Sequence, residues 1–338
     1  MIKLRITLLA ALLASVTFTV AAPPRVLFMI GEPGYKTAET LPAFAKAKLH
    51  PLGIATTFVH ADSANPNHFP GLERIKDADV LFLSVRRRAL SEAQMALIKA
   101  HLAAGRGLVA IRTSSHGFSL GRGTPPAGHV EWKDFDREVL GHRYVKDFNN
   151  KDGTSVSTLA HANREQLLTG IRQNDFRSKG SLYNVADLSG NRVLLRGLIT
   201  HGGEPQIIPV AWSRNYKKSR VVYTSLGHES DFEARLFQQL LVNSIYWTAK
   251  QTVPGYTSTS GLNNSKARNK YDMTISGNDQ VSEIIKTFPG RGEVGDHTKP
   301  TLPLDTLEKF QVNDDFEMEI VSSRRTYRFV TEDAEALA

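Results

Sequence analysis

The stretch between Asp79 and Phe118 constrains the fold more than any other part of this chain. Two short apolar runs, VLFLSV and GLVAI, flank a basic turn and an amphipathic segment. Ser91 followed by Gln94 is typical of a capping box at a helix start, and Gly105 is typical of a helix end. The pattern therefore predicts one parallel βαβ unit, with a loop after each of its strands.

Similar patterns continue to about residue 250, after which the chain becomes polar and turn-rich. Periodicity predicts strands over residues 25–30, 54–59, 80–85, 108–112, 193–198, 207–212 and 220–225. It predicts helices over residues 38–49, 135–140 and 231–249, the last with a capping box of Ser230 and Glu233. This alternation of strands and helices favours an α/β fold with a parallel sheet.

The N-terminal residues 1–22 have the pattern of a secretory signal peptide. Lys3 and Arg5 precede an apolar run over residues 6–20, and small residues allow cleavage after Ala21. That run is short for a membrane span, so we expect an exported protein, periplasmic or extracellular, without a span after cleavage. A retained N-terminal anchor is the alternative.

Composition excludes several classes of function. The 338 residues contain no cysteine, which rules out disulfides, thiolate catalysis and cysteine-bound metal. The formal net charge is +8, but the basic residues are scattered and do not alternate with aromatic residues. This pattern is typical of a solvated basic surface, and we expect no nucleic-acid partner.

Three segments carry a family resemblance: DADVLFLSVRRRALSEAQ, AAGRGLVAIRTSSHGF and PVAWSRNYKKSRVVYTSLGHESDFEARLFQQLLVNSIYWTA. Together they resemble the trehalose-utilisation (ThuA-like) family. The resemblance implies an α/β domain over residues 23–250 with a flavodoxin-like, class I glutamine amidotransferase-like parallel sheet and helices on both faces. It also implies a small-molecule carbohydrate as ligand. Amidotransferase activity is not expected, because the required thiol is missing.

The tail carries a second resemblance. After a predicted linker over residues 251–300, the segment TLPLDTLEKFQVNDDFEMEIVSS resembles the opening of exported dehydrogenases with a β-propeller. Residues 301–338 are accordingly interpreted as the irregular, truncated start of a further domain. The resemblance implies a dehydrogenase or c-type haem partner domain. A C-x-x-C-H motif is missing, so we expect no covalent haem in this chain.

Candidate catalytic residues lie where predicted strands end, since ligands of open α/β sheets bind beyond the carboxyl ends of strands. In RTSSHGF, His116 is a candidate acid or base, and Arg112, Ser114 and Ser115 are candidates for binding an oxyanion or sugar hydroxyl. A purely structural turn is the alternative. His228 follows a later strand as a second catalytic candidate, or else as a helix cap.

Other loops offer candidate substrate-binding residues. Glu32 and Tyr35 follow the first strand and could supply a base and a ring for stacking on a sugar, although a plain connecting loop is the alternative. Arg86 or Arg87 is expected to enter the site, where arginine binds carboxylate or phosphate, with Arg88 on the surface. A solvated basic turn would explain the same residues.

His142 and Tyr183 complete the candidates, and Tyr144 is expected to project toward the same site as His142. Tyr183 is predicted to face a sugar, whereas Trp212, Trp247, Phe232 and Phe237 follow core spacing. His142, with His116 and His228, would be needed for a three-histidine metal site, but their spacing does not support one. We therefore predict no metal and no cofactor.

The expected function is carbohydrate processing on a glycoside or keto-sugar by general acid–base chemistry. His116 or His228 would act as the base, and Arg112 with Ser114 or Ser115 would stabilise developing charge. The alternative is a non-catalytic sugar-binding or scaffolding module that serves an exported dehydrogenase.

Overall fold

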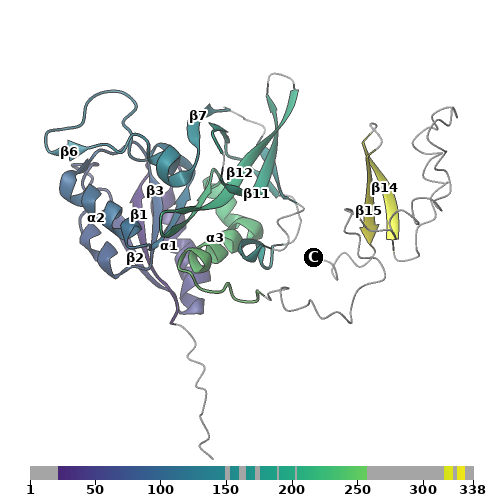
Figure 1. Ribbon diagram of the computed structural model, residues 1–338, viewed down its shortest axis with the longest axis horizontal. Coiled ribbons are helices and arrows are strands. Elements are labelled where there is room, and N and C mark those ends of the chain that lie inside the picture. Colours follow the sequence, from purple (N-terminus) through teal and green to yellow (C-terminus); the bar gives the residue numbers. More distant parts are fainter. Residues whose placement is uncertain are drawn as a thin grey trace, which may run out of the picture. The chain divides into compact units, whose positions relative to one another are not determined.

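A nine-stranded sheet forms the centre of the first of two units into which the chain divides, Met1–Tyr256 and Thr257–Ala338 (Figure 1). The computed structural model describes residues 22–148, 153–159, 165–171, 176–188, 190–201, 204–256, 316–322 and 326–331. The predicted signal segment, apart from Ala22, and most of the tail lie outside these residues. No helix in the described ranges is long and apolar enough to cross a bilayer.

One half of the sheet is parallel, with strand order β2-β1-β3-β5-β13. Its strands are β1 (Arg25–Gly31), β2 (Ala55–His60), β3 (Val80–Val85), β5 (Gly107–Ile111) and β13 (Ser219–Thr224). When the five parallel strands are numbered in chain order, their order in the sheet is 2-1-3-4-5, as in flavodoxin-like sheets. The strand order switches at β1, because the chain adds β2 on one side of β1 and β3 on the other. The predicted flavodoxin-like α/β fold is therefore confirmed.

The other half is antiparallel and extends the sheet from β13 in the order β12-β11-β8-β9. These strands are β12 (Glu204–Tyr216), β11 (Arg192–His201), β8 (Thr154–Thr158) and β9 (Phe176–Ser178). Only residues 202 and 203 separate β11 from β12, and so short a connection can join only antiparallel neighbours. Strands were predicted at the positions of β11 and β12, but their antiparallel direction was not predicted.

Side chains of the parallel strands alternate between two cores, one on each face of the sheet. Phe28 and Phe82 pack with the helices α1 (Thr37–Phe44) and α3 (Arg235–Thr248). Leu27 and Leu81 pack with α2 (Glu92–Ala103) on the opposite face. Because both faces are covered, these strands are apolar at nearly every position, which made them legible in the sequence.

The helix caps were predicted with mixed success. Ser91 caps α2 as expected, its Oγ accepting a hydrogen bond from the Gln94 amide at 3.3 Å. The Gln94 side chain, however, does not complete the box; it binds the backbone of Phe69. The predicted Ser230 cap is wrong, because a 3-10 turn (Glu229–Glu233) precedes α3 and is capped by His228. The predicted helix over 135–140 is a single π-helical turn, Asp136–Leu140.

Three small antiparallel pairs complete the described structure: β7 (Arg143–Asp147) with β10 (Tyr183–Ala186), β4 (Leu90–Ser91) with β6 (His129–Val130), and β14 (Phe316–Ser322) with β15 (Thr326–Thr331). The β14–β15 hairpin belongs to the second unit, where we expected an irregular tail. Its first strand, FEMEIVS, alternates apolar with acidic residues, which is a strand signal.

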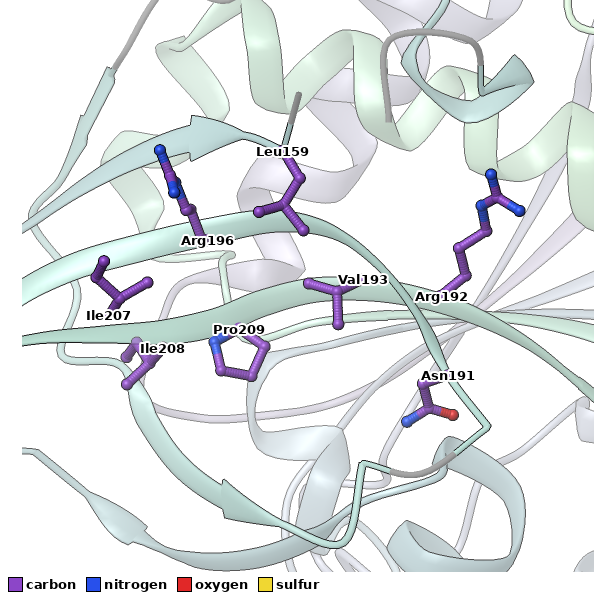
Figure 2. Close-up of a pocket in the computed structure, with 8 residues that line it drawn as sticks. All are labelled: Leu159, Asn191, Arg192, Val193, Arg196, Ile207, Ile208 and Pro209. Carbon is purple, nitrogen blue, oxygen red and sulfur yellow. The ribbon is translucent and has the colours of Figure 1, made fainter. Parts of the chain in front are cut away.

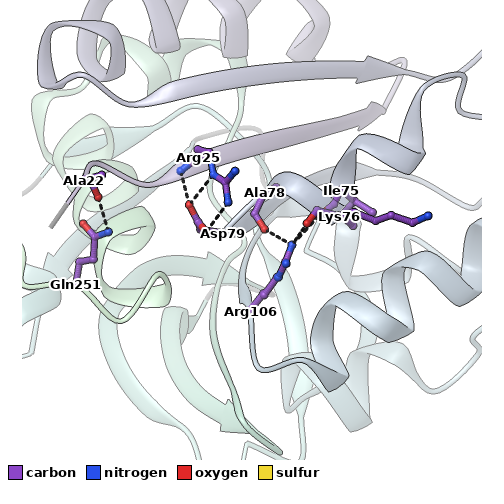
Figure 3. Close-up of polar contacts among 8 residues, drawn as sticks. All are labelled: Ala22, Arg25, Ile75, Lys76, Ala78, Asp79, Arg106 and Gln251. Atoms are coloured by element: carbon purple, nitrogen blue, oxygen red, sulfur yellow. Dashed lines mark hydrogen bonds and ion pairs between the residues drawn. The ribbon is translucent and has the colours of Figure 1, made fainter.

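The amino ends of the parallel strands are held by polar contacts (Figure 3). The Arg25 amide donates to Asp79 at 2.9 Å, and its side chain forms an ion pair with the same carboxylate. Arg106 donates to the carbonyl of Ala78 at 2.9 Å, and Gln251 donates to Ala22 at 2.9 Å. These contacts lie at the amino ends of the parallel strands. The candidate site loops emerge from the opposite, carboxyl ends.

Candidate functional site

The candidate residues follow the carboxyl ends of four parallel strands, β1, β3, β5 and β13. Parallel strands end at the same edge of a sheet, so their loops meet there. Arg112–His116 forms a 3-10 turn directly after β5. The small β7–β10 sheet covers this turn, with the Tyr144 ring 4.5 Å from the ring of His116 and the Tyr183 ring 6.0 Å from it. Tyr183, a predicted site residue, is itself buried.

Arg112 is the central charged group of this region. Its side chain is only 2% exposed, and its Nη1 donates to the Ser225 carbonyl at 3.2 Å. The guanidinium carbon lies 3.9 Å from the Tyr35 ring centroid and 5.8 Å from that of Tyr183. Its backbone has a φ of 48°, a left-handed conformation that is rare outside glycine and frequent at functional sites. The predicted strand thus ends one residue early, at Ile111.

The loop after β1 is anchored to the Arg112 turn through Glu32. One carboxylate oxygen accepts a hydrogen bond from the Thr113 hydroxyl at 2.8 Å, and the other accepts one from the Gly34 amide at 2.5 Å. Glu32 is buried, so these bonds satisfy its acceptors where water is excluded. The structure therefore shows Glu32 holding the loop that carries Tyr35 in place over Arg112.

His116 is held through its Nδ1 atom. Nδ1 lies 3.0 Å from the Ser115 hydroxyl, which also interacts with the Tyr223 hydroxyl. Tyr223 in turn donates to the Arg112 carbonyl at 2.8 Å. If donors run along this chain from His116 to Tyr223, Nδ1 carries the proton and Nε2 is left as an acceptor.

The environment of His116 disfavours its charged form. Burial, together with the positive charges of Arg87 and Arg86, lowers the pKa of His116 to about 3. The imidazole is therefore neutral at physiological pH and can accept a proton or a hydrogen bond.

The sequence left two interpretations of His228 open, a helix cap and a catalytic residue, and the structure shows the cap. His228 caps the turn before α3, its Nδ1 accepting from the Ser230 amide at 3.3 Å. In the neutral ring this leaves the proton on Nε2. The ring also lies 6.1 Å from that of Tyr35, so His228 borders the same group of side chains as Arg112. Capping and a role in the site are compatible.

The serine and arginine candidates divide by what they contact. Ser114 is fully buried, its Oγ donating to the Leu83 carbonyl and accepting from the Val85 amide, so it joins β3 to the turn after β5. Arg86 is exposed and Arg87 half-buried. Arg88 was predicted on the surface, and this is wrong: it is half-buried and donates to the Gly31 carbonyl at 3.0 Å.

His142 lies in the core rather than at the mouth of the site. It is 0% exposed, and its ring packs 5.0 Å from Trp212 and 4.6 Å from Tyr223. Burial lowers its pKa to about 3. In the part of the chain that the structure describes, no three His, Cys, Asp or Glu side chains are grouped to hold a metal ion, and the three-histidine alternative finds no support.

Gly180 was not among the predicted site residues. It packs directly on the guanidinium, because a Cβ built there would lie 2.7 Å from Nη1 of Arg112 and 3.0 Å from Cβ of His228. Tyr144 was expected to project toward the site, and its ring lies beside that of His116, tilted by 43°. The glycine in SKGSLYNV, three residues before Tyr183, was the available signal for Gly180.

A shallow hollow of about 700 Å³ lies elsewhere, on the antiparallel half of the sheet (Figure 2). Its lining includes Ile207 and Pro209 from β12, and Arg192 and Arg196 from β11. Arg192 is paired with Glu165, and Arg196 donates to Ser157 at 3.2 Å. None of the predicted site residues lines it, and it gathers no acid–base groups, so we place the candidate site at the strand ends instead.

The fold is that of a flavodoxin-like α/β protein. The turn after β5 carries arginine, serine and histidine, and the chain has no cysteine. The chain belongs to the ThuA (trehalose utilisation) family, whose model matches residues 25–248. No protein with a curated description matches it.

Solved structures with the same fold include a ThuA-like protein from Parabacteroides merdae. It is 14% identical, with a TM-score of 0.52, over 68% of this chain and 91% of that one. A ThuA-like protein from Bacteroides uniformis is 17% identical, with a TM-score of 0.49, over 68% and 94%. A glutamine amidotransferase from Methylobacillus flagellatus is 11% identical, with a TM-score of 0.35, over 61% and 70%. At these identities the likeness to the first concerns the fold alone.

Proposed function

We propose that this protein processes a carbohydrate, a glycoside or keto-sugar, by general acid–base chemistry at the edge of the sheet where β1, β3, β5 and β13 end. The observation that carries the proposal is the convergence of a neutral histidine and a buried arginine with tyrosine rings. The His116 ring packs against the Tyr144 ring, and Arg112 lies beneath Tyr35. Rings of this kind suit the faces of a sugar, and membership of a trehalose-utilisation family agrees with such a ligand.

In this proposal each group has one role. His116 accepts a proton at Nε2 from a carbon or hydroxyl next to the sugar carbonyl. Arg112 stabilises the negative charge that develops on the carbonyl oxygen, because a fixed cation in a water-poor site needs no reorganisation. His228 donates its Nε2 proton to the departing oxygen. Tyr35 and Tyr183 border the ring of the substrate.

The test is turnover of keto-glycosides by the purified full chain, with His116→Asn and His228→Asn made singly and together. A positioned acid or base contributes about 10²- to 10⁴-fold, so we expect losses of this size in kcat/KM. Because the pKa of His116 is about 3, the acidic limb of the wild-type profile should fall only well below pH 5. Full turnover by the double variant, with its fold shown to be intact, would refute the assignment.

One observation favours the second candidate, a non-catalytic sugar-binding module. A base is most effective when its pKa lies near the working pH, and the pKa of His116 lies far below it. Keto-sugars that raise the melting temperature without yielding product would support the module. Export of the protein and a dehydrogenase-type partner remain predictions from the N-terminal and C-terminal segments.

A further inference from the structure

Arg112 is a buried charge that forms no direct ion pair with any described carboxylate. Its side chain is 98% shielded from solvent. One bond, from Nη1 to the Ser225 carbonyl, is made, while Nε is buried without a hydrogen-bond partner. A buried guanidinium is costly unless its charge is balanced and its donors are used.

The neighbouring groups offset this cost only in part. The Tyr35 ring lies over the guanidinium at 3.9 Å, and a cation–π contact of this kind is weaker than an ion pair in a site shielded from water. Glu32 is a buried carboxylate joined to the same turn, but its two oxygens accept hydrogen bonds from Thr113 and Gly34 rather than from the guanidinium. No carboxylate among the described residues bonds directly to Arg112, and a ligand could supply that bond.

The mouth of the site is also cationic. Arg87 and Arg86 follow β3, and their positive charges add to burial, the largest cause, in lowering the pKa of His116. Burial raises the pKa of Tyr144, and the same two charges oppose that rise. Positive groups gathered around one site attract anions and raise their local concentration.

We propose that the site at these strand ends binds a sugar carrying a permanent carboxylate, a uronic-acid type of ligand, with the carboxylate on the Nε atom of Arg112. This inference rests on the proposed function in that it uses the same site, and it leaves Nη2 of Arg112 for the carbonyl oxygen. A carboxylate matches the guanidinium in planarity and in its single charge, and it would accept the unused Nε donor. A neutral sugar would leave the guanidinium without a directly bonded carboxylate.

Binding requires Tyr35 to move aside, since its ring covers one face of the guanidinium. Tyr35 is half-buried and its neighbours Pro33 and Gly34 are exposed, so the ring can turn toward solvent while Glu32 still holds the backbone of the loop. A bound carboxylate would also oppose the effect of Arg86 and Arg87 on His116. The pKa of His116 would then rise from about 3, while the effect of burial remains, and the ring would become a better base.

The experiment compares a matched pair of ligands on the full chain by isothermal titration calorimetry: methyl β-glucuronide and methyl β-glucoside. They differ in the carboxylate at one carbon. A hydrogen-bonded charge pair that is formed out of water favours the glucuronide by about tenfold or more in Kd. Glucose 6-phosphate is the third arm, expected to bind more weakly than the glucuronide.

Variants locate the carboxylate. Arg112→Gln should abolish the preference for the glucuronide, and Arg112→Lys should retain part of it, because the charge stays but the planar donors are lost. Arg106→Gln is the control: it removes an arginine that donates to backbone carbonyls at the opposite edge of the sheet, and the preference should persist. If Arg112→Gln does not fold, the affinities of the wild-type protein for glucuronide and glucoside still test whether the site prefers a carboxylate.

Any of three results would overturn the inference. The first is equal affinity for glucuronide and glucoside, and the second is tighter binding of glucose 6-phosphate than of glucuronide. The third is an undiminished preference for the glucuronide in a folded Arg112→Gln protein. These results are distinct from failure of the proposed function. Turnover of neutral keto-glycosides without a carboxylate preference would leave the proposed function standing alone. A preference that depends on Arg112, without turnover of any sugar, would leave the binding inference standing alone.

Discussion

His142 should make the protein sensitive to mild acid. The folded state keeps this ring neutral, because burial lowers its pKa to about 3 from an ordinary value of 6.5. Between these values the unfolded chain binds a proton that the folded chain excludes, so stability is present above pH 6.5 and is lost as the pH falls. At pH 5, about 1.5 pH units below the unfolded value, the loss is about 2 kcal/mol for this one residue.

The assay is guanidinium denaturation at pH 7, 6 and 5 for wild type, His142→Leu and His142→Gln. Both substitutions remove the titrating ring, so each variant should lose about 2 kcal/mol less than wild type between pH 7 and pH 5. All other histidines are shared and cancel in the comparison. The absolute stability of the variants does not matter, since only the dependence on pH is compared. Parallel curves for wild type and both variants would refute the reasoning.

Two further substitutions test the packing described above. Gly180→Ala should place a methyl group against the Arg112 guanidinium, which would lower stability by about 1–3 kcal/mol and weaken glucuronide binding. Thermal melts would measure the first effect and calorimetry the second. If neither stability nor affinity changed, the close approach of Gly180 to Arg112 would be contradicted. Ser91→Ala should cost about 1 kcal/mol in denaturation and leave glucuronide affinity unaltered, because it removes only the hydrogen bond to the Gln94 amide at the start of α2. No change in stability would show that the cap is dispensable.

The parallel strands were predictable because both of their faces are covered. β3 was predicted over residues 80–85 and forms over Val80–Val85, since an unbroken apolar run can be satisfied in few other ways. Boundaries set by tertiary contacts were not predictable. Arg112 reads as the end of a strand, yet its backbone turns left-handed there.

The caps show the same limit. Ser230 with Glu233 has the required spacing, but the buried carboxylate of Asp231 instead accepts hydrogen bonds from the amides of Gly227 and His228. A local pattern could not reveal which of two overlapping caps has the buried partner.

The sequence predicted only those site residues that follow the ends of parallel strands. Loops after β1, β3, β5 and β13 were expected at one edge because parallel strands share a direction. Gly180 reaches the same place from a segment outside the parallel half, and nothing in its spacing links it to Arg112. The placement of His142 in the core depends on its packing against Trp212, which joins segments 70 residues apart.

The left-handed backbone at Arg112 puts this position under two opposing demands. Glycine at this position would relax the backbone and remove a buried positive charge from the interior. Selection for stability alone would therefore favour replacement of Arg112 by glycine. Retention of arginine at such a place would therefore be a sign of continuing selection for what the site binds. Relatives that have lost the ligand should be recognisable by a small residue at the end of the same strand.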